Sequence, residues 1–205
     1  TSHMVPTQFH RLLQLPREIR EKYDCSSTRA MIHAAAPCPV HTKHAMIEWW
    51  GNSIWEYYAA TEGGGTVVDA SSWSKFPGTV GKAWPGAEIK IINDDGSEAP
   101  PDNQGTVFMK LGEATKFEYK GDQAKTKKER LVIDDQVYFT VGDIGYLNDG
   151  GYLFLCDRKI DMIISGGANI YPAEIESAFL MHPAVADVAE EADEVDATDD
   201  GGGVG

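Results

Sequence analysis

The segment with the clearest chemical potential is Tyr58-Ala-Ala-Thr-Glu62, which runs into three glycines at positions 63–65. It follows a stretch with strand character, so the Thr61 hydroxyl and the Glu62 carboxylate would project together from a loop at a strand end. Glycines let backbone amides approach an anion closely. Thr61 and Glu62 are therefore candidates for holding a phosphate and a divalent cation. The alternative interpretation is that Thr61 caps a turn and Glu62 is simply exposed.

A second candidate is Asp143, which lies in a glycine-flanked loop, Thr140-Val-Gly-Asp-Ile-Gly145. A carboxylate at such a position can accept hydrogen bonds from both hydroxyls of a ribose, as acidic residues do in dinucleotide folds. An aspartate that only stabilises the turn is equally compatible with the pattern.

A third candidate combines the charged run Asp157-Arg-Lys-Ile-Asp161 with the glycine turn Ser165-Gly-Gly167 and a helix that starts near Pro172. Dense charge, a turn and a capped helix are compatible with a junction between domains. The alternative is a surface hairpin, with acidic residues favoured near the helix N-terminus.

Other well-known chemistries leave no trace in the sequence. It contains neither a G-x-x-x-x-G-K-[ST] phosphate loop nor a G-x-G-x-x-G turn after a strand. H-E-x-x-H, G-x-S-x-G and a His and Cys set at metal spacing are absent as well.

The elements that must position the candidates alternate between strand and helix. We expect a helix over residues 16–23, a buried strand over 29–34, a helix over 40–50 that ends at Gly51, and a strand over 54–58. This alternation predicts an α/β architecture with a parallel sheet.

After the glycines the pattern changes to short strands with turns. We expect strands over 88–92 and 105–111, and a hairpin whose turn is Asn148-Asp-Gly-Gly151. A last unit has a strand over 162–164 and a helix from Pro172 to before His182. The end of the chain is predicted to be disordered.

Composition narrows the class of protein. The 205 residues carry a formal net charge of −14, which disfavours a protein that wraps nucleic acid. Eight acidic residues lie between positions 187 and 200, and the remainder has an ordinary charge of −6. No apolar run is long enough to cross a bilayer, so we expect no transmembrane segment and a cytoplasmic location. The three cysteines are expected to be reduced thiols.

Taken in order, the motifs resemble the adenylate-forming superfamily, and within it most closely the fatty-acid coenzyme A ligases. The resemblance rests on seven segments: Val5-Pro-Thr7, His33-Ala-Ala-Ala-Pro37, Tyr58-Ala-Ala-Thr-Glu62, the run at 78–86, Gly105-Thr-Val107, Thr140-Val-Gly-Asp143 and the run at 157–176. It implies part of a parallel αβ subdomain over 1–75, a small β-rich distorted barrel over 76–157, the start of a C-terminal α+β domain over 158–188, and an acidic tail over 189–205.

The resemblance also implies a reaction and a set of site residues. A fatty acid would be activated with ATP and Mg²⁺ as an acyl-adenylate and transferred to coenzyme A. Thr61 would contact the phosphate, Glu62 the Mg²⁺, Asp143 with Arg158 the ribose, and His33 would approach the acyl pocket. Coenzyme A would pass Ser165, Gly166 and Gly167. The adenine and the rest of the nucleotide would be lined by Ala35, Ala36, Pro37, Glu56, Tyr57, Tyr58, Ala59 and Ala60.

Some features depart from the family pattern. Ile160 occupies the position expected for the hinge between domains. The family's phosphate loop is expected before Val5, and its catalytic lysine is expected after Val188. The chain is therefore expected to be the middle of a longer synthetase and inactive alone. An adenylating ligase for an aryl or amino acid, or a non-catalytic nucleotide-binding or scaffolding remnant, stays open. Trp49, Trp50 and Ile54 are expected to form an apolar patch that causes self-association.

Overall fold

The structure is a computed structural model that describes residues 1–60, 64–111, 129–158, 163–165, 168–170 and 172–179, together with His182, Ala184, Val185 and Val188. The chain divides into two compact units, Thr1–Lys159 and Ile160–Gly205. The predicted acidic tail over 189–205 and the hinge position Ile160 lie outside the described residues.

The first unit begins with a parallel three-stranded sheet, as the strand and helix alternation predicted. Strand β2 (Met31–His33) pairs in parallel with β1 (Ser2–Met4) on one side and with β3 (Ile54–Ala59) on the other. The pairing of β1 was not predicted, because three residues are too few to show a pattern.

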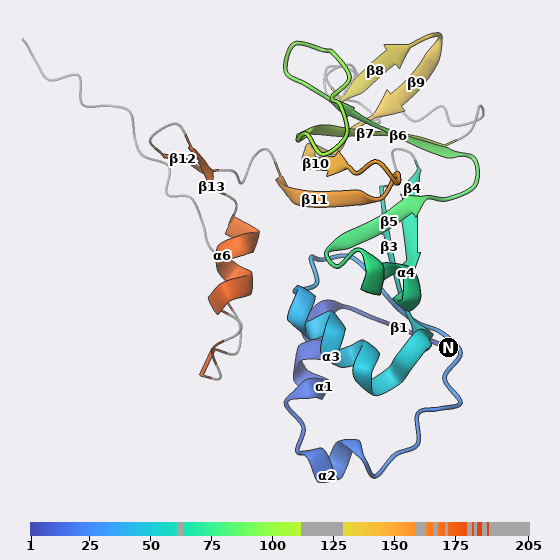
Figure 1. Cartoon of the computed structure of the whole chain (residues 1–205), viewed down its shortest axis with the longest axis vertical. Coiled ribbons are helices and arrows are strands. Elements are labelled where there is room, and N and C mark those ends of the chain that lie inside the picture. Colours follow the sequence, from blue (N-terminus) through green and yellow to red (C-terminus); the bar gives the residue numbers. More distant parts are fainter. Residues whose placement is uncertain are drawn as a thin grey trace, which may run out of the picture. The chain divides into compact units, whose positions relative to one another are not determined.

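Helices α1 (Pro6–Leu13), α2 (Arg17–Arg20) and α3 (Val40–Trp50) lie at the end of the first unit that contains β1 (Figure 1). The bounds of α3 agree with the prediction, and Gly51 ends it with a φ of 61° before the short 3-10 turn η1 (Gly51–Ser53). Helix α2 is shorter than the predicted 16–23.

A hydrophobic core joins these helices to the sheet. Its buried members are Phe9, Met31, Met46, Ile54 and Ala70. Ile54 is 0% exposed, so its predicted place in an exposed apolar patch is wrong: as the first residue of β3 it faces the helices. Trp49 and Trp50 are half-buried against the same core, and self-association stays a prediction.

The sheet continues in antiparallel fashion beyond β3. Strand β4 (Gly65–Asp69) pairs with β3 and with β5 (Thr79–Ala83), and the short helix α4 (Ala70–Lys75) connects the two. The Asp69 side chain caps α4 by accepting from the Ser72 amide at 2.9 Å. Neither strand nor helix was predicted here.

Strand β5 also pairs with β11, so one hydrogen-bonded sheet contains eleven of the described strands. The ladder is continuous across position 75, and the predicted boundary there stays a prediction. The predicted strands and the hairpin over 143–158 are confirmed. The β-rich part consists of β6 (Ala87–Ile92), β7 (Gly105–Leu111), β8 (Arg130–Ile133), β9 (Gln136–Phe139), β10 (Asp143–Leu147) and β11 (Leu153–Arg158).

The second unit contains a short antiparallel hairpin and a helix. Strand β12 (Ile163–Ser165) pairs with β13 (Ala168–Ile170), and α6 (Pro172–Phe179) follows. The predicted strand and the helix starting at Pro172 are confirmed. Among the described residues, no helix is both long and apolar enough to cross a membrane.

Candidate functional site

Two of the predicted nucleotide-binding residues meet although 85 residues separate them. The Tyr58 hydroxyl, near the end of β3, donates a hydrogen bond of 2.5 Å to Oδ2 of Asp143, the first residue of β10. Asp143 is 8% exposed. A hydrogen bond to a carboxylate is among the stronger ones in proteins, so this contact fixes the direction of the Asp143 side chain.

Arg158 lies next to Asp143 in the sheet. Strands β10 and β11 are antiparallel, and their register places the Cα atom of Asp143 opposite that of Arg158. The two residues predicted to share the ribose are therefore cross-strand neighbours. The position of the Arg158 side chain is outside what the structure describes.

The loop predicted to line the adenine begins where β2 ends. Ala35, Ala36 and Pro37 are exposed, and Ala35 has a φ of 75°, which is uncommon for a residue with a Cβ atom. Because β2 and β3 are parallel neighbours, this loop and the end of β3 at Ala59 and Ala60 lie at the same edge of the sheet.

Other predicted residues fall outside the described parts. These are Thr61 and Glu62, predicted for the phosphate and the Mg²⁺, and Gly166 and Gly167, predicted for coenzyme A. The residues that flank Thr61 and Glu62 are joined, since the Ala60 amide donates to the Gly64 carbonyl at 3.4 Å. Among the described residues, no group of three or more His, Cys, Asp or Glu side chains is placed to hold a metal ion.

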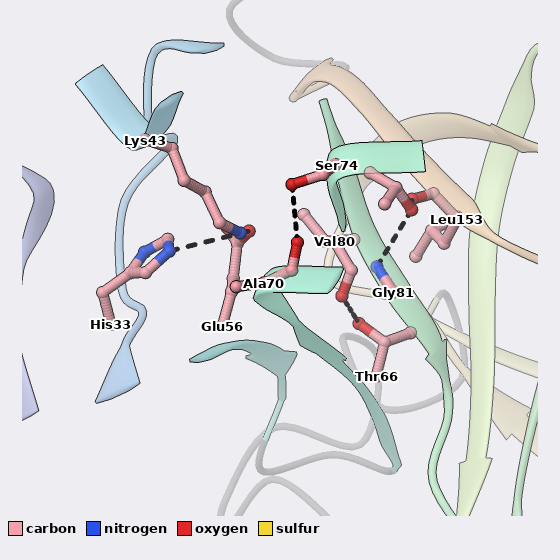
Figure 2. A network of polar contacts seen from close by, with 10 residues as sticks. His33, Lys43, Glu56, Thr66, Ala70, Ser74, Val80, Gly81 and Leu153 are labelled. Atoms are coloured by element: carbon pink, nitrogen blue, oxygen red, sulfur yellow. Dashed lines mark hydrogen bonds and ion pairs between the residues drawn. The ribbon is translucent and has the colours of Figure 1, made fainter. Parts of the chain in front are cut away.

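A buried charged cluster lies under this edge of the sheet. Figure 2 shows the side chains of His33, Lys43 and Glu56 pointing toward one another. The Lys43 ammonium donates a hydrogen bond to Oε2 of Glu56, and the same oxygen is 3.8 Å from Nε2 of His33. The side chains are only 1% exposed for Lys43 and 7% for Glu56.

Burial controls the protonation of the cluster. It lowers the pKa of His33 to about 3, and the nearby Lys43 charge acts in the same direction, so the ring is neutral at physiological pH. Burial also lowers the pKa of Lys43 and raises the pKa of Glu56, while the attraction between the two groups opposes both shifts. Both ring nitrogens of His33 lack a hydrogen-bond partner within the described structure.

Glu56 and Tyr57 were both predicted to lie beside the nucleotide. The Glu56 carboxylate is bound by Lys43 inside the protein, and its predicted role beside the nucleotide stays a prediction. Tyr57 points to the opposite face of β3 from Tyr58, is 36% exposed, and has its hydroxyl 3.4 Å from Nε2 of His3.

Lys43 was missed by the sequence reasoning. It lies on α3 one turn before Met46, in the stripe of residues that the helix buries. A lysine in the apolar stripe of a helix is a sequence signal for a buried partner, because an isolated ammonium would be too costly to bury.

Comparison with known proteins shows the family to which this chain belongs. A family model described as AMP-binding enzyme matches residues 1–115, which is more than half of the chain. The chain therefore belongs to the AMP-binding enzyme family.

Individual relatives agree with this class. A long-chain-fatty-acid–CoA ligase from Bacillus subtilis strain 168 is 32% identical over 185 residues, 89% of this chain and 32% of the relative. A 2-succinylbenzoate–CoA ligase from Bacillus velezensis is 39% identical over 137 residues, 65% of this chain and 27% of the relative. The chain thus spans about a third of the length of the curated relatives it matches.

Among solved structures, O-succinylbenzoate coenzyme A synthetase from Bacillus subtilis in complex with AMP has a TM-score of 0.73 and 29% identity. The match covers 91% of this chain and 37% of that one. The fold is therefore the mixed α/β fold of adenylate-forming enzymes, with the parallel sheet that the sequence predicted.

Proposed function

We propose that this chain supplies the adenosine-binding part of an adenylate-forming ligase that joins a fatty acid to coenzyme A. The observation that carries the proposal is the hydrogen bond from Tyr58 to Asp143, which joins two of the separated segments predicted to surround one nucleotide.

The reaction has two steps. A carboxylate oxygen of the acid attacks the α-phosphorus of ATP, and the bond to the departing pyrophosphate breaks. The thiol of coenzyme A then loses its proton, its sulfur attacks the acyl carbon, and AMP leaves. Because a carboxylate and a triphosphate repel each other, catalysis depends on positioning and on offsetting charge.

Each proposed role follows from the chemistry of a residue. Asp143 accepts hydrogen bonds from the ribose hydroxyls, and Arg158 on the adjacent strand assists it. The loop at Ala35, Ala36 and Pro37 borders the adenine. Thr61 donates to the phosphate, Glu62 holds the Mg²⁺ that offsets phosphate charge when bound, and Gly166 and Gly167 border the path of coenzyme A.

The fatty acid is the proposed substrate because the long-chain-fatty-acid–CoA ligase matches over 89% of this chain. An aryl acid is the second candidate, favoured by the relative that is named as a 2-succinylbenzoate ligase. Coenzyme A-dependent AMP release, measured with both kinds of acid on an enzyme that contains this chain, distinguishes the two.

Calorimetry with AMP tests the adenosine site in this chain. We expect AMP to bind, and Asp143→Asn to weaken its affinity about tenfold, because the amide has one acceptor oxygen in place of two. Asp149→Asn, in the turn at the far end of β10, is the matched control and should leave the affinity unchanged.

Two results would contradict the assignment. Equal loss of affinity in both variants would mean that Asp143 has no particular role. No binding of AMP to the unaltered chain would favour a non-catalytic scaffolding remnant.

A further inference from the structure

The buried Lys43–Glu56 pair carries a desolvation cost that apolar side chains in the same place would not have. Removing two charges from water costs several kcal/mol, and apolar residues of the same volume often stabilise a fold equally well. The Lys43 side chain is 1% exposed and lies 4.8 Å from the centre of the Trp73 ring. The pair is therefore better explained by a role in positioning its neighbours than by a gain in stability.

Lys43 is the group that offsets the charge of Glu56. The other neighbour, His33, is neutral because burial keeps its pKa at about 3. His33 and Glu56 are register partners on parallel strands, so the two side chains emerge on one face of the sheet. Lys43 reaches that face from α3 and ties the helix to β3.

Glu56 and Tyr58 lie on the same face of β3, because side chains alternate along a strand. The exposure pattern agrees, since Ile54 and Glu56 are buried and Tyr57 is exposed. Tyr58 in turn donates to Asp143 on β10. One face of β3 thus connects α3, through Lys43 and Glu56, to the carboxylate proposed to bind the ribose.

We propose that Lys43 is a positioning residue for the nucleotide site: its bond to Glu56 sets the placement of β3, and β3 sets the direction of Asp143 through Tyr58. The inference rests on the proposed function for its consequence in AMP binding. The placement of Asp143 can be measured without a nucleotide.

The test compares a variant that breaks the pair with one that replaces it. Lys43→Met leaves the Glu56 carboxylate buried alone and should destabilise the protein. The double variant Lys43→Met with Glu56→Leu replaces the pair by apolar side chains of similar volume, so its melting temperature should return close to that of the unaltered chain. Only the double variant separates positioning from stability.

Hydrogen exchange of backbone amides measures how firmly Tyr58 and residues 143–145 are held. In the double variant we expect exchange at Tyr58 and at residues 143–145 to be about tenfold faster, with β8 unchanged. The AMP affinity should also be about tenfold weaker, because the carboxylate no longer has a fixed direction. Lys90→Met is the matched control, since Lys90 of β6 lies 2.7 Å from the exposed carboxylate of Glu98.

The path through Tyr58 is tested by repeating the double variant in a Tyr58→Phe background. We expect little further change there at residues 143–145, because the hydroxyl that transmits the effect is absent. An equal change in both backgrounds would overturn the proposal.

The remaining outcomes are also decisive. Unaltered exchange at Tyr58 and residues 143–145 in the double variant would overturn the positioning role, whatever AMP does. Faster exchange there in a chain that never binds AMP would leave the positioning role standing and refute the adenosine site.

Discussion

Two carboxylates near the candidate site accept hydrogen bonds from other side chains. The Asp143 carboxylate accepts from Tyr58, and the Glu56 carboxylate accepts from Lys43. Fixing an acidic group before the ligand arrives reduces the entropy that binding must overcome. The chemistry of this site therefore depends on pairs of residues.

His33 makes the stability of the protein depend on pH. Its pKa is about 3 in the folded chain and 6.5 in the unfolded chain, so the unfolded state binds more protons between those values. The stability that the neutral His33 ring contributes is fully present above pH 6.5 and is lost as the pH falls toward 3. Between pH 6.5 and about pH 4, His33 should remove about 3 kcal/mol from the free energy of unfolding.

Urea unfolding across this pH range measures the effect. His33→Leu should flatten the pH dependence relative to the unaltered chain. An identical pH dependence for His33→Leu and the unaltered chain would show that the ring takes up its proton equally well in the folded and the unfolded chain.

At the scale of elements, Gly81 on β5 marks a close approach between strands. A Cβ atom there would lie 2.2 Å from the Val67 carbonyl oxygen of β4, and the φ of Gly81 is 103°. Gly86 has a φ of 85° and no atom within 4 Å of its hypothetical Cβ. The two glycines share a backbone conformation suited to glycine and differ in available space.

We expect Gly81→Ala to cost about 4 kcal/mol or more, because strand β5 must move away from β4. Gly86→Ala should cost only about 1 kcal/mol, from backbone strain alone. Thermal or urea unfolding of the two variants decides this. Equal costs would mean that the β4–β5 contact is looser than the structure describes.

Local signals explain which elements could be predicted. The helix over 40–50 has a periodic apolar stripe and a terminal glycine, and the turn at 148–151 contains Asp-Gly, so α3 and the β10–β11 hairpin were predictable. Helix α4 has Ser71 and Ser72 in its first turn and depends on its Asp69 cap, so its residue types resemble a loop. The pairing of β1 depends on tertiary contacts that three residues cannot encode.

In the candidate site, too, some features were predictable from the local sequence and others were not. Asp143 and the segment at 58–62 were identified from residue types at strand ends, which local sequence reveals. The bond between Tyr58 and Asp143 and the pair of Lys43 with Glu56 join positions 85 and 13 residues apart. Such pairs depend on sheet order, which no local pattern specifies.

At the scale of the whole molecule, the first unit contains the described part of the proposed nucleotide site. Its sheet brings the ends of β2 and β3 to one edge, and β10 and β11 present Asp143 and Arg158 as neighbours. The central claim is that these segments surround a single adenosine.

Amide chemical shifts in an AMP titration test that claim most directly. We predict that Ala35, Ala36, residues 58–60 and residues 143–145 shift together and saturate with one affinity, while β6 is unaffected. Shifts confined to one of these segments, or saturating with different affinities, would contradict the account.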